Sequence, residues 1–226
     1  MKRTGHDGYE TPKVMVDIVL FTVAGGRLHV ALACREDRNE PFAGRDALVG
    51  GFIHVDEDDD ARAAAARILL AKTGLADVYI EQLQTFSGRH RDPRGWSVSI
   101  AYMALVPLAR LLEAGREEVT LRPAEEVSGL PFDHDDILRT ALQRLRGKGA
   151  YSTLPARLLD SAFTLAAMQQ VYEQVMGTRI DASSFRRKVA ELDLIEETGE
   201  MESGERRRPG RLFRLKRGVT TFDRKI

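Results

Sequence analysis

The spacing of apolar residues changes near Gly147-Lys148-Gly149, and this change most constrains how the chain can fold. Upstream, apolar and β-branched runs are separated by turn residues and enclose an alanine-rich helix, which is typical of a mixed α/β domain. Downstream, apolar residues recur at helical spacing and end in a short alternating strand. The pattern predicts a hinge at residues 147–149 between two domains, residues 1–148 and residues 149–226.

The first domain is predicted to begin with a β-hairpin. Residues 14–23 and 28–34 are apolar runs on either side of Gly25-Gly26, and such runs around a Gly-Gly turn are typical of a hairpin. Residues 48–53 predict a short strand that is interrupted by glycines, which indicates a bulge or a close backbone approach to a ligand.

The rest of this domain alternates between helix and strand signals. Residues 61–72 predict a helix that follows aspartates and stops at Gly74. Residues 78–86 and 96–106 predict strands, and residues 133–145 predict a further helix. One helix between strands and another after them indicate a mixed sheet with helices.

The second domain is predicted to contain two helices followed by a hairpin. Thr164 and Gly177 mark the ends of the first helix, and Asp181 or Ser183 marks the start of the second. The buried stripe of the second helix is predicted to comprise Phe185, Val189 and Leu192. At 100° per residue, the face turned away from it comprises Ser183, Arg186, Arg187 and Ala190.

A basic stretch follows these helices. The chain as a whole has 34 basic and 34 acidic residues, yet residues 205–217 contain seven Lys or Arg and one Glu. Residues 196–210 are polar and contain glycine, and residues 212–215 alternate as a strand does, so a hairpin with a basic loop is expected. Helix, turn, basic helix and hairpin outline an α+β winged helix-turn-helix domain that contacts a polyanion.

The helix of the first domain lies in a degenerate motif. Gly50-Gly51, an acidic run and residues 67–75 resemble the Nudix box, whose helical glutamates hold Mg²⁺ or Mn²⁺ against a substrate diphosphate. Alignment on Arg67 and Gly74 fills the three glutamate positions with Ile68, Ala71 and Lys72. We therefore expect no catalytic residues, no metal site of the Nudix type and no enzyme activity.

The acidic run itself leaves two interpretations open. The chain has 15 residues between Gly51 and Arg67, where the box has 13, so either Glu57 or Asp59 can match the upstream glutamate of the box. Residues 56–60 are all acidic and could bind a metal through oxygen ligands. The interpretation that we favour is that they are solvated charges at a helix N-terminus, which the helix dipole stabilises.

Residues around the box are candidates for binding a nucleotide diphosphate without a metal, because arginine side chains and backbone N–H groups bind phosphate and aromatic rings stack on bases. The candidates are Arg35, Phe42, Arg45, Gly50, Gly51, Phe52, Arg67, Arg91, Arg94 and Trp96. The alternative is that Phe52 and Trp96 belong to the core and that the arginines are solvated loop residues.

Longer segments resemble a family of bacterial regulators. The segments are residues 16–22, 41–45, 50–53 and 91–99 in the first half, and residues 163–165, 184–188 and 194–199 in the second. Together they are similar to the Nudix-related transcriptional regulator family, repressors of NAD-synthesis genes. This resemblance implies an α/β Nudix-like sandwich followed by a winged helix, a homodimer, a palindromic operator in double-stranded DNA, and ADP-ribose as effector.

Two features leave the pathway and the effector open. Some relatives in this family regulate sugar catabolism instead. The family usually reads Trp-Ala-Leu-Pro-Gly-Gly before the box, whereas this chain begins the same segment with Asp46. The resemblance therefore implies regulation of NAD-metabolism genes, with sugar catabolism as the alternative.

The second helix and the wing are expected to contact DNA, with arginine reading guanine and the wing reaching phosphates or the minor groove. The predicted DNA-binding residues are Ser183, Ser184, Arg186, Arg187, Lys188, Arg206, Arg207, Arg208 and Arg211. Two alternatives remain: a hydrolase that acts on ADP-ribose or a nucleoside diphosphate through the acidic loop, and a winged helix that binds protein.

The remaining composition excludes several classes of protein. No apolar stretch approaches 18 residues, and the polar N-terminus lacks a signal-peptide core, so neither a membrane span nor secretion is expected. Cys34 is the single cysteine, which excludes an internal disulfide and a multi-cysteine metal site. A cytoplasmic protein is expected.

Overall fold

The computed structural model describes residues 11–35, 40–115, 119–202, 210–216 and 221–222. A six-stranded mixed sheet forms the larger part, with the strand order β4-β5-β1-β3-β2-β6. Its strands are β1 (Lys13–Ala24), β2 (Arg27–Cys34), β3 (Asp46–Phe52), β4 (Tyr79–Gly88), β5 (Ser97–Leu105) and β6 (Val119–Pro123). The β1–β5 pair is parallel, and the other pairs are antiparallel.

The predicted hairpin is present. β1 and β2 pair antiparallel around Gly25 and Gly26, whose φ angles of 55° and 72° are left-handed. A type I′ turn requires this conformation at both central positions, and glycine adopts it without strain. β1 then pairs with β3 further from the turn, so residues 15–18 of β1 lie beside Gly50 and Gly51.

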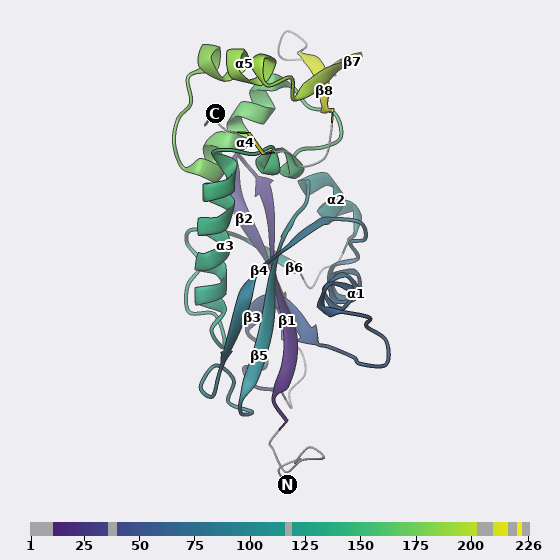
Figure 1. Cartoon of the computed structure of the whole chain (residues 1–226), viewed down its shortest axis with the longest axis vertical. Coiled ribbons are helices and arrows are strands. Elements are labelled where there is room, and N and C mark those ends of the chain that lie inside the picture. The colour runs from purple at the N-terminus through teal and green to yellow at the C-terminus, as the bar shows by residue number, and fades with distance from the viewer. Residues whose placement is uncertain (1–10, 36–39, 116–118, 203–209, 217–220, 223–226) are drawn as a thin grey trace.

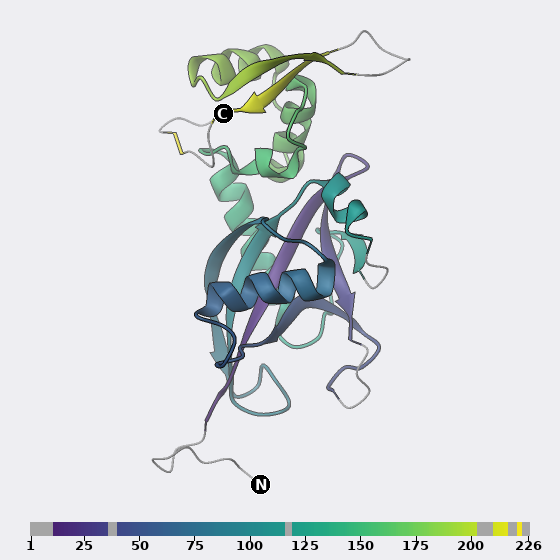
Figure 2. The same ribbon diagram turned by 90° about the vertical axis from the view of Figure 1, so that its right-hand side faces the viewer.

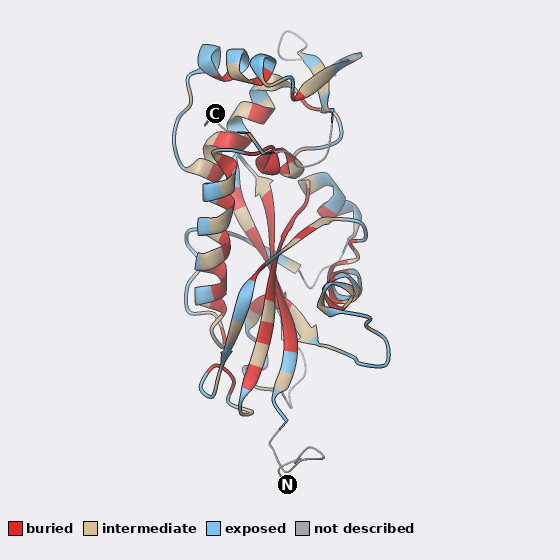
Figure 3. Cartoon of the chain, viewed as in Figure 1, coloured by how far each residue is buried: buried red, intermediate tan, exposed pale blue. Residues whose placement is uncertain are grey.

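Helices cover both faces of the sheet (Figures 1 and 2). On one face, α1 (Ala61–Thr73) and α2 (Leu108–Glu113) pack near Ile18 and Leu20, and on the other α3 (His134–Gly149) packs near Val19 and Phe21. Successive side chains of a strand point to opposite faces, so one apolar strand serves both cores. Buried residues therefore run along the middle of the sheet and along the inner side of α3, as Figure 3 shows.

The caps of α1 agree with the sequence prediction. The Asp60 carboxylate accepts a hydrogen bond from the Ala63 N–H at 2.7 Å, and Gly74 ends the helix at a φ of 73°. Gly51 lets this helix approach β3, because a Cβ there would stand 3.2 Å from the Cδ1 of Ile68. Gly51 thus allows close packing of the helix against the sheet.

The second unit contains α4 (Leu165–Met176), α5 (Ala182–Glu191) and a hairpin of β7 (Ile195–Met201) and β8 (Arg211–Leu215). Thr164 and Asp181 cap the two helices with their side chains. Phe185 and Val189 are buried against α4, whereas Leu192 is only half-buried. The hairpin begins earlier than expected, because β7 spans residues 195–201 and so includes the first part of the predicted polar stretch, residues 196–210.

The predicted hinge is wrong. α3 continues through Gly147, Lys148 and Gly149. A Cβ added at Gly149 would stand only 3.1 Å from the Cγ1 of Val175 in α4. The absence of a side chain at Gly149 leaves room for the close approach of α4 to α3. The sequence analysis also overlooked α2, β6 and the short 3₁₀ helix η1 (Leu154–Leu158).

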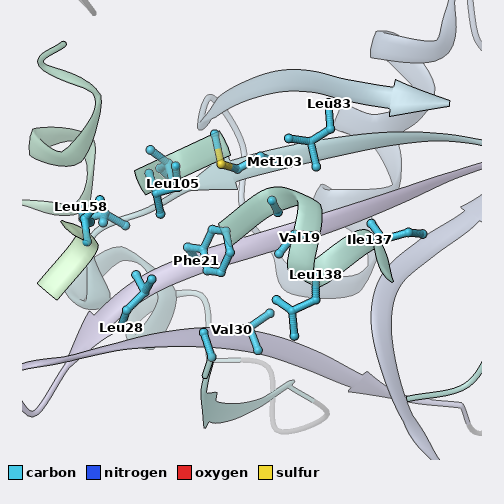
Figure 4. Packing of buried hydrophobic residues seen from close by; sticks show 14 of the residues in the cluster. Val19, Phe21, Leu28, Val30, Leu83, Met103, Leu105, Ile137, Leu138 and Leu158 are labelled. Atoms are coloured by element: carbon cyan, nitrogen blue, oxygen red, sulfur yellow. The ribbon is translucent and has the colours of Figure 1, made fainter. Parts of the chain in front are cut away.

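One apolar cluster joins the two units. Phe21, Leu105 and Ile137 of the first unit belong to the same buried cluster as Leu158 and Val175 of the second. Figure 4 shows Leu158 beside the strand and helix side chains of this cluster. The domain boundary at residues 148 and 149 stays a prediction. Within the described ranges, no helix is both long enough and apolar enough to cross a membrane.

Candidate ligand pocket and nucleic-acid interface

A pocket of about 560 Å³ opens at the end of the sheet where β3 meets the C-terminal end of α1. It is lined by Met15, Asp17, Ala33, Cys34, Arg35, Glu40, Leu48, Gly50, Gly51, Phe52, Ala71, Lys72, Arg94, Phe132 and His134. A pocket of this size, with a lining that is mostly apolar in area and a few convergent charges, is typical of a small-molecule site.

Asp17 lies at the base of this pocket and is almost fully buried. Burial by itself raises the pKa of a carboxyl group, but His134, Ser99 and Arg91 more than offset it and lower the pKa of Asp17 to about 2. The Ser99 hydroxyl donates to Asp17 Oδ2 at 2.6 Å, and Arg91 Nη2 donates to the same oxygen at 3.3 Å. Asp17 is thus a buried carboxylate that is fully ionised at neutral pH.

His134 links this carboxylate to β3. Its Nδ1 accepts a hydrogen bond from the Leu48 N–H at 3.1 Å, so in the neutral ring the proton sits on Nε2. Nε2 lies 3.4 Å from Asp17 Oδ1 and faces it as a donor. Gly50 completes the arrangement, because a Cβ there would stand 2.3 Å from that same oxygen.

Arg91 lies beneath the pocket and does not line it. The residue is 8% exposed, and its Nε and Nη2 donate to the two carboxylate oxygens of Asp133 at 2.8 Å each. Asp133 directly precedes α3, so Arg91 ties the loop after β4 to the start of that helix. Burial by itself lowers the pKa of Arg91, but the carboxylates of Asp133 and Asp17 more than offset this and raise it. The same two carboxylates hold the Arg91 side chain in the core.

Arg35 and Arg94 form the polar wall of the pocket together with Glu40 between them. Arg35 donates to Glu40 at 3.2 Å, Arg94 also donates to Glu40, and Arg94 pairs with Asp92 at 2.8 Å. The Arg94 guanidinium lies 5.0 Å from the Phe52 ring centre. Cations stacked on aromatic rings give a surface that suits a phosphate beside a planar ring.

Phe132 is a pocket residue that the sequence analysis missed. Its ring centre lies 4.8 Å from the Arg35 guanidinium and 5.8 Å from that of Arg94. The residue has a left-handed φ of 59° in the turn before α3, which turns its ring toward the two arginines. Nothing in the local pattern of residues 130–134 distinguishes it from a core aromatic.

Asp17 and His134 were also missed. Asp17 is the one charge within an apolar run of ten residues, and such an exception in a buried strand was an available signal. His134 carried no such signal, because a histidine at a helix start is ordinary. Asp17 of β1 meets His134 and Phe132 in the pocket because the start of α3 packs against the sheet.

Besides Arg91, four predicted ligand residues lie outside the pocket lining. Phe42 packs edge-on against Phe132 with ring centres 4.9 Å apart, and Arg45 donates to the carbonyl of Gly129. Trp96 is 45% exposed beyond the rim. Arg67 donates two hydrogen bonds of 2.7 Å to the Asp58 carboxylate and a third to the Phe52 carbonyl. It therefore stabilises the acidic loop before α1. Their role in binding stays a prediction.

Asp46, which stands where the family usually has a tryptophan, lies outside the pocket lining. It begins β3 opposite Cys34 of β2, and the described pocket lining does not include it. Leu48, Gly50 and Gly51 of the same strand do line the pocket. The replacement of the usual tryptophan by Asp46 therefore lies two residues from the nearest pocket residue of this strand.

The residues of α1 do not fit a metal of the Nudix type. Ile68 is buried against Gly51, while Ala71 and Lys72 face the pocket with a methyl group and an ammonium group. Hard divalent cations need oxygen ligands, which none of these side chains supplies. Among the residues that the structure describes, no group of three or more His, Cys, Asp or Glu side chains could hold a metal ion.

Two residues of the acidic run before α1, Asp58 and Asp60, stabilise the local structure. Asp60 caps α1, and the side chain of Asp58 is 2% exposed because Arg67 and the His54 N–H donate to it. These donors lower the pKa of Asp58 to about 2. Glu57, by contrast, is exposed and pairs loosely with His54.

The second unit presents a cationic helix face. On α5, Ser184, Arg186 and Arg187 are exposed, and neither arginine forms an ion pair with a described residue. α5 lies at the end of the molecule opposite the N-terminus, where its outer side is open to solvent (Figures 1 and 3). An exposed face with uncompensated arginines is suited to a nucleic acid.

The other predicted contact residues differ in their surroundings. Ser183 donates to the Asp181 carboxylate at 2.6 Å, and the Lys188 side chain is only 16% exposed beside Glu191. Arg211 is exposed at the start of β8 and pairs with Glu197 at 2.8 Å. Residues 206–208, which include three of the predicted wing contacts, lie outside the described part of the chain.

Comparison with known proteins decides the family. A family model described as the NrtR DNA-binding winged helix domain matches residues 155–215. The ADPR responsive transcriptional repressor NtrR of Acinetobacter baylyi is 36% identical over 212 residues, which cover 92% of this chain and 83% of that protein. This chain belongs to the NrtR family. The resemblance to Nudix-related transcriptional regulators is thereby confirmed.

Solved structures of NrtR extend the likeness to both units. Shewanella oneidensis NrtR complexed with a 27mer DNA is 35% identical and matches with a TM-score of 0.84, covering 94% of this chain and 99% of that one. The Nudix domain of the same NrtR, complexed with ADP ribose, is 32% identical with a TM-score of 0.53 and covers 62% and 93%. The expected fold, a Nudix-like α/β domain followed by a winged helix, is confirmed.

Proposed function

We propose that this chain is a transcriptional repressor whose winged helix binds operator DNA and whose Nudix-like domain binds ADP-ribose or a related nucleotide. The exposed face of α5 carries the proposal, because Arg186 and Arg187 stand there without carboxylate partners among the described residues. The NtrR of Acinetobacter is an ADPR responsive repressor, and the Shewanella NrtR was crystallised with DNA and, as its Nudix domain, with ADP ribose. Both relatives support the same function here.

DNA recognition in this proposal uses α5 in the major groove. Ser184, Arg186 and Arg187 face base edges, since arginine forks to guanine and serine contacts bases or phosphates. Arg211 and the basic residues 206–208 contact phosphates from the wing. The chain acts as a homodimer on a palindromic operator, because a two-fold protein matches a two-fold site.

The pocket serves as a sensor and not as an active site. Arg35 and Arg94 bind the diphosphate, while Phe52 and Phe132 offer rings for stacking. Metal-dependent hydrolysis has no support from α1, where Ile68, Ala71 and Lys72 replace the glutamates. The regulated genes belong to NAD metabolism, with sugar catabolism as the alternative, and the genes beside this one on the chromosome distinguish the two.

An Arg187→Ala variant tests the DNA interface. With a duplex selected from random sequences by the full-length protein, we expect a loss of affinity of about 5- to 150-fold, because one arginine contact to a base contributes about 1–3 kcal/mol. Arg139→Ala is the control, since Arg139 is an equally exposed cation on α3 that pairs with Asp136. Wild-type affinity and salt dependence in Arg187→Ala would contradict the assignment of α5.

Titration with ADP-ribose tests the sensor. We expect ADP-ribose to bind the free protein in calorimetry and to release the operator duplex, because an effector shifts DNA binding only if it binds one state better. Failure both to bind and to release would refute ADP-ribose as effector. Formation of AMP from ADP-ribose with Mg²⁺ would instead support the hydrolase.

A further inference from the structure

Helix α1 carries a cation where a Nudix enzyme carries a metal ligand. Lys72 occupies one of the three positions of the missing glutamates, and its side chain lines the same pocket as Gly50 and Gly51. The second position, Ala71, lines the pocket with a methyl group, and the third, Ile68, is buried. This face of α1 therefore brings a positive charge to the pocket and no ligand for a divalent cation.

Lys72 differs from the other cations of the pocket wall in having no partner. Arg35 pairs with Glu40, and Arg94 pairs with both Glu40 and Asp92. The structure gives Lys72 no hydrogen bond and no ion pair with any residue that it describes. Its charge is thus uncompensated in the wall of the pocket.

The surroundings of Lys72 favour the arrival of an anion. Lys72 is exposed to solvent in the wall of the pocket. The partial desolvation of its ammonium group by the surrounding atoms and the nearby Arg35 lower its pKa, while Asp17 opposes this. The Asp17 carboxylate is already satisfied by Ser99, His134 and Arg91, so it does not replace an anionic partner for Lys72. A cation beside a second cation gains interaction energy when a doubly charged diphosphate binds between them.

We propose that Lys72 binds the diphosphate of the nucleotide directly and thereby takes the place of the divalent cation that Nudix enzymes use. Ligand binding in this pocket is then independent of metal, and the lysine positions the diphosphate without activating water. This inference rests on the proposed function only in that the pocket binds a nucleoside diphosphate. It assigns to Lys72 a role that the repressor function by itself does not require.

Calorimetry on the full-length protein tests the inference with two probes, ADP-ribose and ADP, each in EDTA and in Mg²⁺. We expect wild-type affinity to agree within twofold between the two buffers. Lys72→Gln should weaken binding of both probes at least tenfold, whereas Lys72→Arg, which keeps the charge, should stay within threefold of wild type. Lys13→Gln is the matched control, because Lys13 is a cation near Phe52 that does not line the pocket.

The outcomes separate the two proposals. Loss of wild-type binding in EDTA, or equal affinities of Lys72→Gln and Lys13→Gln, would overturn the role of Lys72 while ADP-ribose remained the effector. Binding of ADP but not of ADP-ribose, with the same dependence on Lys72, would overturn the effector and support the lysine. Absence of binding for both probes would overturn both. A urea titration of each variant measures its free energy of unfolding. It shows whether the substitution of Lys72 only destabilises the C-terminal end of α1, where a cation interacts favourably with the helix dipole.

Discussion

At the scale of single residues, Asp17 shows how a charge is kept in an apolar sheet. It faces the pocket side of β1, between buried Val16 and Ile18 on the opposite face, and three polar side chains surround its carboxylate. A buried carboxylate without such partners would become neutral. The network around Asp17 therefore fixes the base of the pocket before any ligand binds.

Asp17→Asn is expected to destabilise the protein in a manner that depends on pH. The folded pKa of about 2 lies below the usual value of about 3.9, so the ionised group stabilises the fold above pH 4. This contribution, about 2 kcal/mol at neutral pH, is lost as the pH falls through 2. Urea unfolding of wild type and variant at pH 7, 4 and 3 should show the difference shrinking toward low pH.

Asp136→Asn is the control for this series. Asp136 forms only an exposed ion pair with Arg139 on α3, so its removal should change the unfolding free energy by less than about 1 kcal/mol. A difference between wild type and Asp17→Asn that is as large at pH 3 as at pH 7 would contradict the ionised state of Asp17.

At the scale of elements, hydrogen bonds that involve side chains of α4 and the N-cap of α5 stabilise the turn between these two helices. Glu173 of α4 accepts a hydrogen bond from the Ile180 N–H at 2.8 Å, and Gln169 donates to the Ile180 carbonyl at 2.9 Å. Asp181 then accepts from the Ser184 N–H at 2.8 Å. These bonds fix the angle at which α5 presents its arginines.

Asp181→Ala removes this N-cap and is expected to lower the unfolding free energy by about 1 kcal/mol. The loss also frees Ser183, whose hydroxyl donates to the same carboxylate, so operator affinity should fall although no DNA contact is deleted. Asp181→Asn, which retains an accepting oxygen, should lie between wild type and the alanine variant. Urea titrations and DNA binding measure both effects, and equal stability of the alanine and asparagine variants would argue against the cap.

At the scale of the whole molecule, α3 connects the pocket to the winged helix. His134 at its start lines the pocket, and Gly149 at its end contacts Val175 of α4. The apolar cluster beside it contains residues of both units (Figure 4). A shared core of this kind makes the two units cooperative, because neither buries its apolar surface completely alone.

Separation of the units tests this cooperativity. A fragment of residues 150–226 would expose Leu154, Leu158, Val171 and Val175, which are buried in the shared cluster. Each such side chain contributes about 1.5–3 kcal/mol on burial, so the fragment should unfold at markedly lower urea than the same unit in the full chain. Circular dichroism of both in urea makes the comparison, and equal midpoints would mean that the winged helix folds independently.

The sequence by itself determined the local structure of this protein and the loss of its catalytic glutamates. The Gly25-Gly26 turn, the caps at Asp60 and Thr164, and the two faces of α5 depend on residues a few positions apart, and propensity and periodicity report such neighbours. The replacement of glutamate at positions 68, 71 and 72 is equally visible without a structure.

Only the tertiary structure decided the pocket and the joint between the units. Asp17, Gly50, Arg91 and His134 meet because β1 pairs with both β3 and β5 and because α3 packs across the sheet, and strand order does not follow from local pattern. For the same reason Arg91, predicted to bind a ligand, lies in the core. The glycines at 147 and 149 indicated a hinge, yet close packing on α4 keeps α3 helical there. Long-range contacts override local propensity wherever the free energy gained by burial exceeds the conformational entropy lost when the residue is fixed.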